Sequence, residues 1–179
     1  MKTNLKYYLL GLLLVLPSFY WLFNTNYWNM HDDMQILRQL ELEKCLDAGQ
    51  FPCRWSPDPG YQFGYPLLNF YPPLPYLFGQ IFRSAGFSFV MSIKMVAVLQ
   101  FVFSYSAMYA LGLFLGGGLT GLLAAVFYTY LPYHAVNVYI RGAMNEAWAG
   151  VFFPSFGVTA LLSGAQTTVC HFPWALFTG

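Results

Sequence analysis

The chain has 179 residues, of which 58% are hydrophobic, 21% are aromatic and only 8% are charged. Soluble domains carry roughly 25% charged residues, so this composition excludes an ordinary soluble fold, and its apolar content excludes a disordered chain. The net charge of +1 gives no electrostatic reason to expect a nucleic-acid partner. We therefore expect an all-α integral membrane protein whose first partner is the lipid bilayer.

The first apolar segment covers residues 7–23 and follows two lysines, Lys2 and Lys6. The residues after it are bulky, whereas a signal-peptidase site needs small ones, so we expect an uncleaved anchor. Positively charged flanks favour the cytoplasmic side of a membrane. This places the N-terminus in the cytoplasm and residue 24 on the outer face of the plasma membrane.

Residues 24–90 are expected to form a long extracytoplasmic first loop. Within it, residues 31–48 contain no Gly or Pro and predict a helix, with Asn29 as N-cap and Gly49 at the end. Cys45 and Cys53 either form a disulfide, if this loop faces an oxidising compartment, or remain two thiols. The segment rich in proline and aromatic residues that follows predicts extended and interfacial structure.

Three more spans are expected at about residues 91–115, 119–131 and 147–163, which gives a multi-pass protein with about four transmembrane helices. The apolar stretch 74–85 is shorter than the ~20 residues that a span needs, so we prefer a helix in the membrane interface. This choice puts all seven acidic residues on one face. If residues 74–85 span instead, Glu146 lies opposite Asp32. Residues 1–164 would form one membrane domain, and residues 165–179 would form an unassigned tail, which could mark a truncation.

The charged residues suggest the candidate site. After Met95 the chain has only two of them, Arg141 and Glu146, and charges beside a span are usually paired or functional. Asp32 and Asp33 lie near the start of the predicted helix, where they either cap it or act chemically, as a general base or, at Asp32, as a metal ligand. Glu146 would join them.

Three further side chains are candidates for binding a substrate phosphate: Arg54, His134 and Arg141. The alternative for each is contact with lipid headgroups or a place in the interface. No sequence motif for a nucleotide-binding loop, a zinc protease or a serine hydrolase is present.

Four blocks of the sequence, taken together, resemble a known group: HDDMQILRQLELEKCLDAGQFPCRW, GYQFGYPLLNFYPPLPY, SIKMVAVLQFVFSYSAMYALGLF and YLPYHAVNVYIRGAMNE. This group is the bacterial polytopic membrane proteins labelled as carrying a 6-pyruvoyl-tetrahydropterin synthase-related membrane domain. These proteins are themselves similar to the GT-C class of membrane glycosyltransferases. The resemblance covers roughly residues 1–150, and it places the chain in a bacterial inner membrane.

The resemblance implies transfer of a sugar from a polyprenyl-phosphate donor to an acceptor on the extracytoplasmic face. An acidic residue of the first outer loop is central to that chemistry, and here it would be Asp32, with Asp33 beside it and Glu146 as the second acid. A divalent metal ion is the one cofactor implied. The pterin label is not taken as an activity.

The chain departs from the pattern because it has four expected spans where such proteins usually have ten or more. An isolated chain would then be incomplete as an enzyme, or would need further membrane subunits. The alternative function is a non-catalytic membrane subunit whose outer loop binds a partner or lipid. A transporter segment is a third interpretation, but no pair of interrupted helices favours it.

Overall fold

The computed structural model describes residues 2–163. Its elements, in chain order, are α1 (Lys2–Phe19), η1 (Tyr20–Phe23), α2 (Gln35–Asp47), α3 (Leu67–Phe70), α4 (Leu74–Ser84), α5 (Phe89–Gly116), α6 (Gly118–Thr129), α7 (Pro132–Ala135), η2 (Val136–Arg141) and α8 (Met144–Leu162). The only strand-like pairing in this part of the chain is an isolated bridge between Ser56 and Tyr65. The expectation of an all-α fold is therefore confirmed for residues 2–163, and the predicted tail 165–179 lies outside the described residues.

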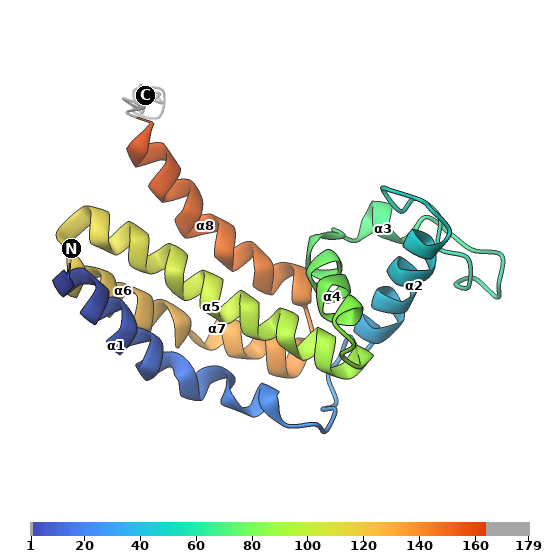
Figure 1. The fold of residues 1–179 in the computed structure, drawn as a ribbon, viewed down its shortest axis with the longest axis horizontal. Helices are drawn as coiled ribbons and strands as arrows, with labels where there is room; N and C mark the ends of the chain where they lie inside the picture. The colour runs from blue at the N-terminus through green and yellow to red at the C-terminus, as the bar shows by residue number, and fades with distance from the viewer. Residues whose placement is uncertain (1, 164–179) are drawn as a thin grey trace, which may run out of the picture.

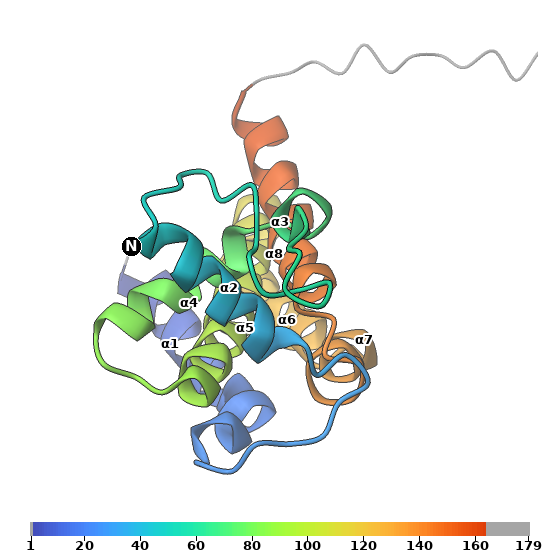
Figure 2. The same cartoon turned by 90° about the vertical axis from the view of Figure 1, so that its right-hand side faces the viewer.

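The helices form an elongated bundle that is covered at one end (Figure 1). Helices α1, α5, α6 and α8 run along the bundle, while α2, α3 and α4 lie across one end, which we call the capping end. The N-terminus of α1 and the turn between α5 and α6 lie at the opposite end. Figure 2 looks onto the capping end, with α2 and α4 in front of the bundle. The segments that carry the seven acidic residues all lie at the capping end.

Two helical segments, Asn4–Phe23 and Phe89–Gly116, are long and apolar enough to cross a membrane. Helix α6 is also apolar but has only 12 residues. The observed bounds of α5, α6 and α8 agree with the predicted apolar segments to within a few residues. The structure thus contains two helices that could span a membrane, which supports the prediction of a membrane protein.

The bundle is held by close packing between α5 and α6 and by hydroxyl groups that reach α1. A Cβ atom at Gly112 would lie 2.8 Å from Cα of Gly121, so the two helices approach as closely as they do because both residues are glycine. Tyr105 and Tyr109 donate hydrogen bonds from α5 to backbone carbonyls of α1, at 2.8 and 2.5 Å. Tyr139 of η2 does the same at 2.7 Å. These aromatic residues are structural contacts inside the bundle.

A covalent link and an ion pair between two helices help to fix the capping end. Cys45 and Cys53 form a disulfide with their Cα atoms 5.6 Å apart, which ties the segment after α2 to the helix itself. Arg83 of α4 binds Glu43 of α2 through two nitrogens, at 2.8 and 3.1 Å. Gly49 follows α2 with φ of +77°, as a glycine at a helix end commonly does.

The predicted helix 31–48 begins four positions late, at Gln35, and the prediction of Asn29 as its N-cap is wrong. The reason is a competing long-range pairing of the backbone. The N–H of His31 donates to the carbonyl of Ile140, and the N–H of Asp32 donates to the carbonyl of Arg141, both at 2.9 Å. Residues 31 and 32 are therefore held as an extended segment against η2.

Candidate functional site

A polar pocket of about 340 Å³ opens at the capping end, between the start of α2 and the turn from η2 into α8. Its lining comprises His31, Asp32, Gln35, Arg38, Tyr71, Arg141, Ala143, Met144, Asn145 and Glu146. Three residues that the sequence analysis proposed, Asp32, Arg141 and Glu146, are thus brought to one pocket from segments about a hundred residues apart. We call this the Asp32 pocket.

The backbone contacts of residues 31 and 32 bring these segments together, and a glycine permits the approach. Gly142 has φ of +68°, and a Cβ atom there would lie 2.6 Å from the carbonyl oxygen of Asp32. A side chain at this position would therefore clash with the backbone as well as strain the turn. The turn after η2 can lie against the Asp32 segment because residue 142 is glycine.

Gln35 holds the same two segments through its side chain. Its amide nitrogen donates to the carbonyl of Gly142 at 2.7 Å, and its amide oxygen accepts from the Tyr76 hydroxyl at 2.7 Å. Burial raises the pKa of Tyr76 to about 12, so this hydroxyl stays protonated and remains a donor at ordinary pH. Gln35, Tyr76 and Gly142 form a buried hydrogen-bonded link between α2, α4 and η2.

The Asp32 carboxylate is paired with a buried cation. Nη1 of Arg38 lies 2.7 Å from Oδ2 of Asp32, and the Asp32 side chain keeps 34% of its surface exposed while that of Arg38 keeps 7%. The Arg38 guanidinium also lies over the Tyr71 ring, 3.8 Å from its centroid. Gln35 donates to the same Oδ2 at 3.2 Å. The carboxylate is thus held in one orientation and still reaches the pocket.

Across the pocket, Arg141 and Glu146 form an exposed ion pair, with contacts of 2.5 and 2.9 Å. Arg141 also donates to Asn137 at 2.8 Å, and Tyr133 donates to Glu146 at 3.1 Å. The Arg141 guanidinium and then the Tyr133 hydroxyl hold the pKa of Glu146 below its usual range. Glu146 therefore stays ionised and orients Arg141. The π-helical segment η2 places Arg141 here, and such segments are frequent at functional sites.

The side chains of this arrangement do not fit a bound divalent metal ion. Oδ2 of Asp32 accepts from Arg38 and Gln35, and both oxygens of Glu146 accept from Arg141. Divalent cations such as Mg²⁺ and Ca²⁺ need several oxygen ligands, and guanidinium groups repel them. Within residues 2–163, no three His, Cys, Asp or Glu side chains gather closely enough to hold a metal ion. The metal ion expected at Asp32 stays a prediction, and the reaction proposed below does not use it.

The other three candidates lie elsewhere. Asp33 follows Asp32 but does not line the pocket, and its carbonyl accepts from the Tyr27 hydroxyl at 3.4 Å. Arg54 lines a separate hollow beside Pro52 and Leu68. His134 is 4% exposed, with its Nδ1 within 3.2 Å of the Gln100 amide and its ring against Tyr128.

Burial lowers the pKa of His134, so the neutral ring is favoured inside the bundle. The site in this structure therefore consists of Asp32, Arg141 and Glu146, with Asp33, Arg54 and His134 placed outside the pocket.

Sequence reasoning missed Gln35, Arg38 and Tyr71, which complete the pocket. One signal in the sequence pointed to the first two of them. The apolar residues of 31–48 form no single stripe, and the structure shows why: the buried side of α2 is largely polar, with Gln35, Arg38, Gln39 and Glu41 all inside. A helix with a polar buried side is expected where a hydrogen-bonded site is built.

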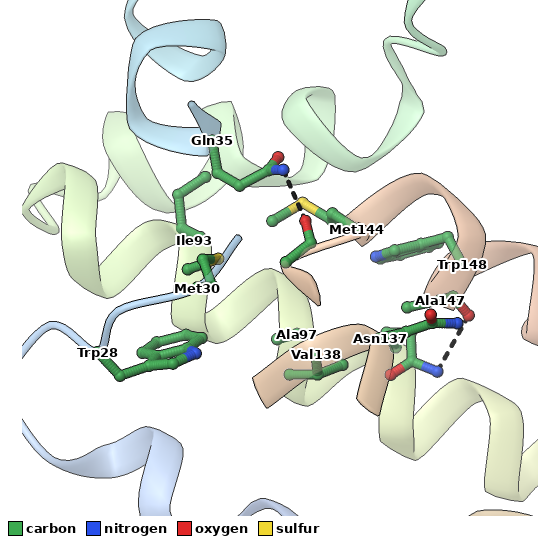
Figure 3. A pocket seen from close by; sticks show the side chains of 12 residues that line it. Trp28, Met30, Gln35, Ile93, Ala97, Asn137, Val138, Met144, Ala147 and Trp148 are labelled. Atoms are coloured by element: carbon green, nitrogen blue, oxygen red, sulfur yellow. Dashed lines mark hydrogen bonds between the residues drawn. The ribbon is translucent and has the colours of Figure 1, made fainter. Parts of the chain in front are cut away.

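A second, smaller cavity lies inside the bundle and shares Gln35 and Met144 with the Asp32 pocket (Figure 3). Trp28 and Trp148 lie on opposite sides of it, with Asn137 and Val138 below. The space open to the centre of a water molecule is only about 20 Å³, so it is too small for a substrate. We call it the inner cavity.

No family model, no curated protein and no solved structure matches the chain.

Proposed function

We propose that this chain is part of a membrane glycosyltransferase that moves a sugar from a polyprenyl-phosphate donor to an acceptor on the extracytoplasmic face. The chain would supply the general base and the group that binds the phosphate of the donor. The single observation that carries the proposal is the Asp32 pocket. One partly exposed carboxylate there lies across from an exposed arginine, at the end of a bundle that contains apolar helices. The resemblance of residues 1–150 to GT-C-like proteins points to the same chemistry.

The proposed membrane arrangement has four spans, at about residues 7–23, 91–115, 119–131 and 147–163. The N-terminus is cytoplasmic and the capping end is extracytoplasmic. The disulfide between Cys45 and Cys53 supports this side for the capping end, because disulfides persist in oxidising compartments. The position of α4 across the end of the bundle supports an interfacial helix at residues 74–84.

The proposed reaction assigns a role to each pocket residue. The acceptor oxygen attacks the anomeric carbon of the sugar, and its proton passes to the Asp32 carboxylate. The contacts of this carboxylate with Arg38 and Gln35 fall on Oδ2, so Oδ1 is the oxygen that takes the proton. The bond from the anomeric carbon to the phosphate oxygen breaks, and Arg141 stabilises the charge that develops on the leaving lipid phosphate.

The test compares two adjacent aspartates in the full chain, together with any membrane subunits that purify with it. Release of polyprenyl phosphate from a polyprenyl-phosphate hexose is measured in lipid nanodiscs. Loss of a general base typically costs 10²–10⁴ in rate, so Asp32→Asn should lose about that much, and Asp33→Asn should retain activity because its side chain does not line the pocket. Equal activity of the two variants would overturn the role of Asp32.

A second function, a non-catalytic subunit whose outer loop binds a partner, is favoured by one specific observation. The turn between Ser56 and Tyr65 carries Tyr61 and Phe63 almost fully exposed, at 98% and 85%. Tyr61 and Gln62 also have φ of +58° and +70°, a conformation that is costly for residues other than glycine. Exposed aromatic side chains on a strained turn are typical of contact surfaces.

The two functions predict different results for the same set of variants. A binding subunit should keep its lipid affinity in Asp32→Asn and Glu146→Gln. It should lose its association with a larger membrane complex, seen as a smaller native size, when Tyr61 and Phe63 are both changed to Ser. A transferase should lose sugar release in Asp32→Asn whether or not the aromatic turn is intact.

A further inference from the structure

Four buried polar atoms of residues that line the inner cavity have no hydrogen-bond partner in the described structure. They are Nε1 of Trp28, Nε1 of Trp148, Nδ2 of Asn137 and Oε1 of Gln100. The side chains of Trp148, Asn137 and Gln100 are at most 3% exposed, so bulk solvent does not reach them. Buried polar groups in folded proteins are nearly always hydrogen-bonded. These atoms therefore require a partner that the protein itself does not supply.

The contacts of the two amides fix which atom of each lacks a partner. Arg141 only donates hydrogen bonds, so the Asn137 atom that it contacts at 2.8 Å must be the oxygen, and the nitrogen is left over. The carbonyl of Ala147 only accepts, so the Gln100 atom that it contacts at 3.1 Å must be the nitrogen. The Gln100 oxygen is then the one left over.

Trp148 cannot turn to find another partner. Its ring stacks on Phe78 with centroids 4.8 Å apart, and Phe103 packs edge-on at 5.9 Å. Figure 3 shows its indole nitrogen directed toward the middle of the cavity, beside Met144. Trp28 lies on the opposite side of the cavity. The cavity thus presents three donors, from Trp148, Asn137 and Trp28, and one acceptor, from Gln100.

The size and the chemistry of the cavity agree on one class of ligand. A cavity needs roughly 10–15 Å³ open to the centre of a water molecule to hold one water, and the inner cavity offers about 20 Å³. Water accepts two hydrogen bonds and donates two. A metal ion would be repelled by the three donors, and an anion would be repelled by the Gln100 oxygen.

We infer that the inner cavity is a binding site for an ordered water molecule that bridges Trp148, Asn137 and Gln100. The water accepts from the Trp148 indole and from the Asn137 amide, which uses both of its acceptor positions, and it donates to the Gln100 oxygen. The Trp28 indole lies across the cavity and is not part of this bridge. The water thereby holds Asn137 with its oxygen on Arg141, which lines the Asp32 pocket. This inference does not depend on the proposed function.

The direct test is the transfer of magnetisation from water to the indole protons of the full chain, labelled with ¹⁵N-tryptophan in detergent. Trp148→Phe identifies the Trp148 signal. Cross-relaxation between the Trp148 indole proton and water should have the sign that is characteristic of a bound water molecule. The indole of Trp55, which is 50% exposed in the loop after α2, should show the sign of freely exchanging water. A resolved Trp148 signal without cross-relaxation to water would mean that the cavity is dry, and would overturn the inference.

A second measurement is the difference in Tm between two variants, whose sign depends on whether the cavity holds water or is dry. Ala97 lines the cavity, so Ala97→Val fills part of it. If the cavity holds water, the valine expels the water and leaves the three polar atoms that it bridges without a hydrogen-bond partner. Tm should then fall further than in Ala107→Val, a matched change on α5 at a position that does not line the cavity. If the cavity is dry, filling it should raise Tm relative to Ala107→Val, which would contradict the inference.

Discussion

Gln35 connects two segments that lie 107 positions apart in the chain, and it does so with a single amide. Both ends of this amide are used inside the protein, since its nitrogen donates to Gly142 and its oxygen accepts from Tyr76. The residue itself is 1% exposed. The hydrogen bond from Gln35 to Gly142 and the backbone hydrogen bond from Asp32 to Arg141 together hold Asp32 in the pocket.

We predict that Gln35→Leu destabilises the protein more than Tyr76→Phe does. Leucine keeps much of the volume but removes the donor to the Gly142 carbonyl, which then keeps only its bond from the Met144 N–H. It also leaves the Tyr76 hydroxyl buried without its acceptor, at a cost of about 1–3 kcal/mol. Tyr76→Phe leaves only the Gln35 oxygen without its donor. The free energies of unfolding in detergent are to be compared. Equal stability of Gln35→Leu and wild type would show that the link contributes nothing.

Glu41 is a buried carboxylate in the middle of α2, fully inside the protein, with its Oε1 unpaired among the described residues. Burial first, and then the charge of Asp58, raise its pKa, against a lowering by the Asp58 N–H and by Lys44. Because the folded-state pKa lies above the unfolded one, folding disfavours the ionised form. Stability is then lost as the pH rises from the unfolded pKa through the folded one, and the penalty is complete above both.

Glu41→Gln should therefore raise Tm at pH 7.5, and the difference from wild type should vanish near pH 4, where wild-type Glu41 is also neutral. A gain of about 1 kcal/mol corresponds to roughly 2–4 °C for a chain of this size. Glu43→Gln is the matched control, because Glu43 pairs with Arg83 and its loss should lower Tm or leave it unchanged. A pH-independent difference for Glu41→Gln would contradict a burial effect.

At the scale of elements, the sequence predicted the helices whose formation depends on local pattern. It missed the helix boundaries and the helix type that depend on contacts with distant parts of the chain. The apolar segments at 91–115 and 119–131 gave α5 and α6 because hydrophobic length and a glycine turn act locally. The start of α2 was misplaced because residues 31 and 32 pair with η2, far away in the chain. The π-helical form of η2 has no local signature, so the sequence predicted no element between the expected spans 119–131 and 147–163.

The loop between α2 and α3 depends on its disulfide, and this can be measured by counting thiols. The chain has three cysteines, of which Cys45 and Cys53 are joined and Cys170 lies outside the described residues. In membranes isolated without reductant and then denatured, a maleimide reagent should label one thiol, and after reduction it should label three. Labelling of three thiols without reduction would mean that the capping end faces a reducing compartment.

Cys45→Ser should lower stability by about 2–4 kcal/mol, the usual range for a native disulfide. Cys170→Ser serves as the control, since it removes a thiol without touching the disulfide.

At the scale of the whole molecule, the arrangement of the helices decides whether the candidate acids can act together. The sequence left two arrangements open, because residues 74–85 were short but apolar. In the structure α4 lies across the capping end, and Asp32 and Glu146 line one pocket. The distribution of acids along the sequence anticipated this, since six of the seven lie between Asp32 and Asp58. The missing single apolar stripe of α2 indicated a polar buried side, but it did not show that Gln35, Arg38 and Tyr71 meet at one pocket, because only the fold brings them to the same place.

The arrangement in the membrane can be tested with single cysteines in intact cells, against a Cys170→Ser background that keeps the disulfide and so offers no other free thiol. Asp33→Cys and Ile140→Cys report on the capping end, since both side chains are exposed there. Leu115→Cys reports on the opposite end, where it is 66% exposed, and is a better choice than Gly117, whose φ of +86° disfavours a side chain.

A membrane-impermeant maleimide should label positions 33 and 140 from outside, and position 115 only after the cells are opened. This result would put both acids of the pocket on the extracytoplasmic face, where a lipid-linked sugar and its acceptor can meet. Labelling of 33 without 140 would mean that residues 74–85 cross the bilayer. Asp32 and Glu146 would then lie on opposite sides of the membrane, which is incompatible with a shared pocket and with the proposed transferase site.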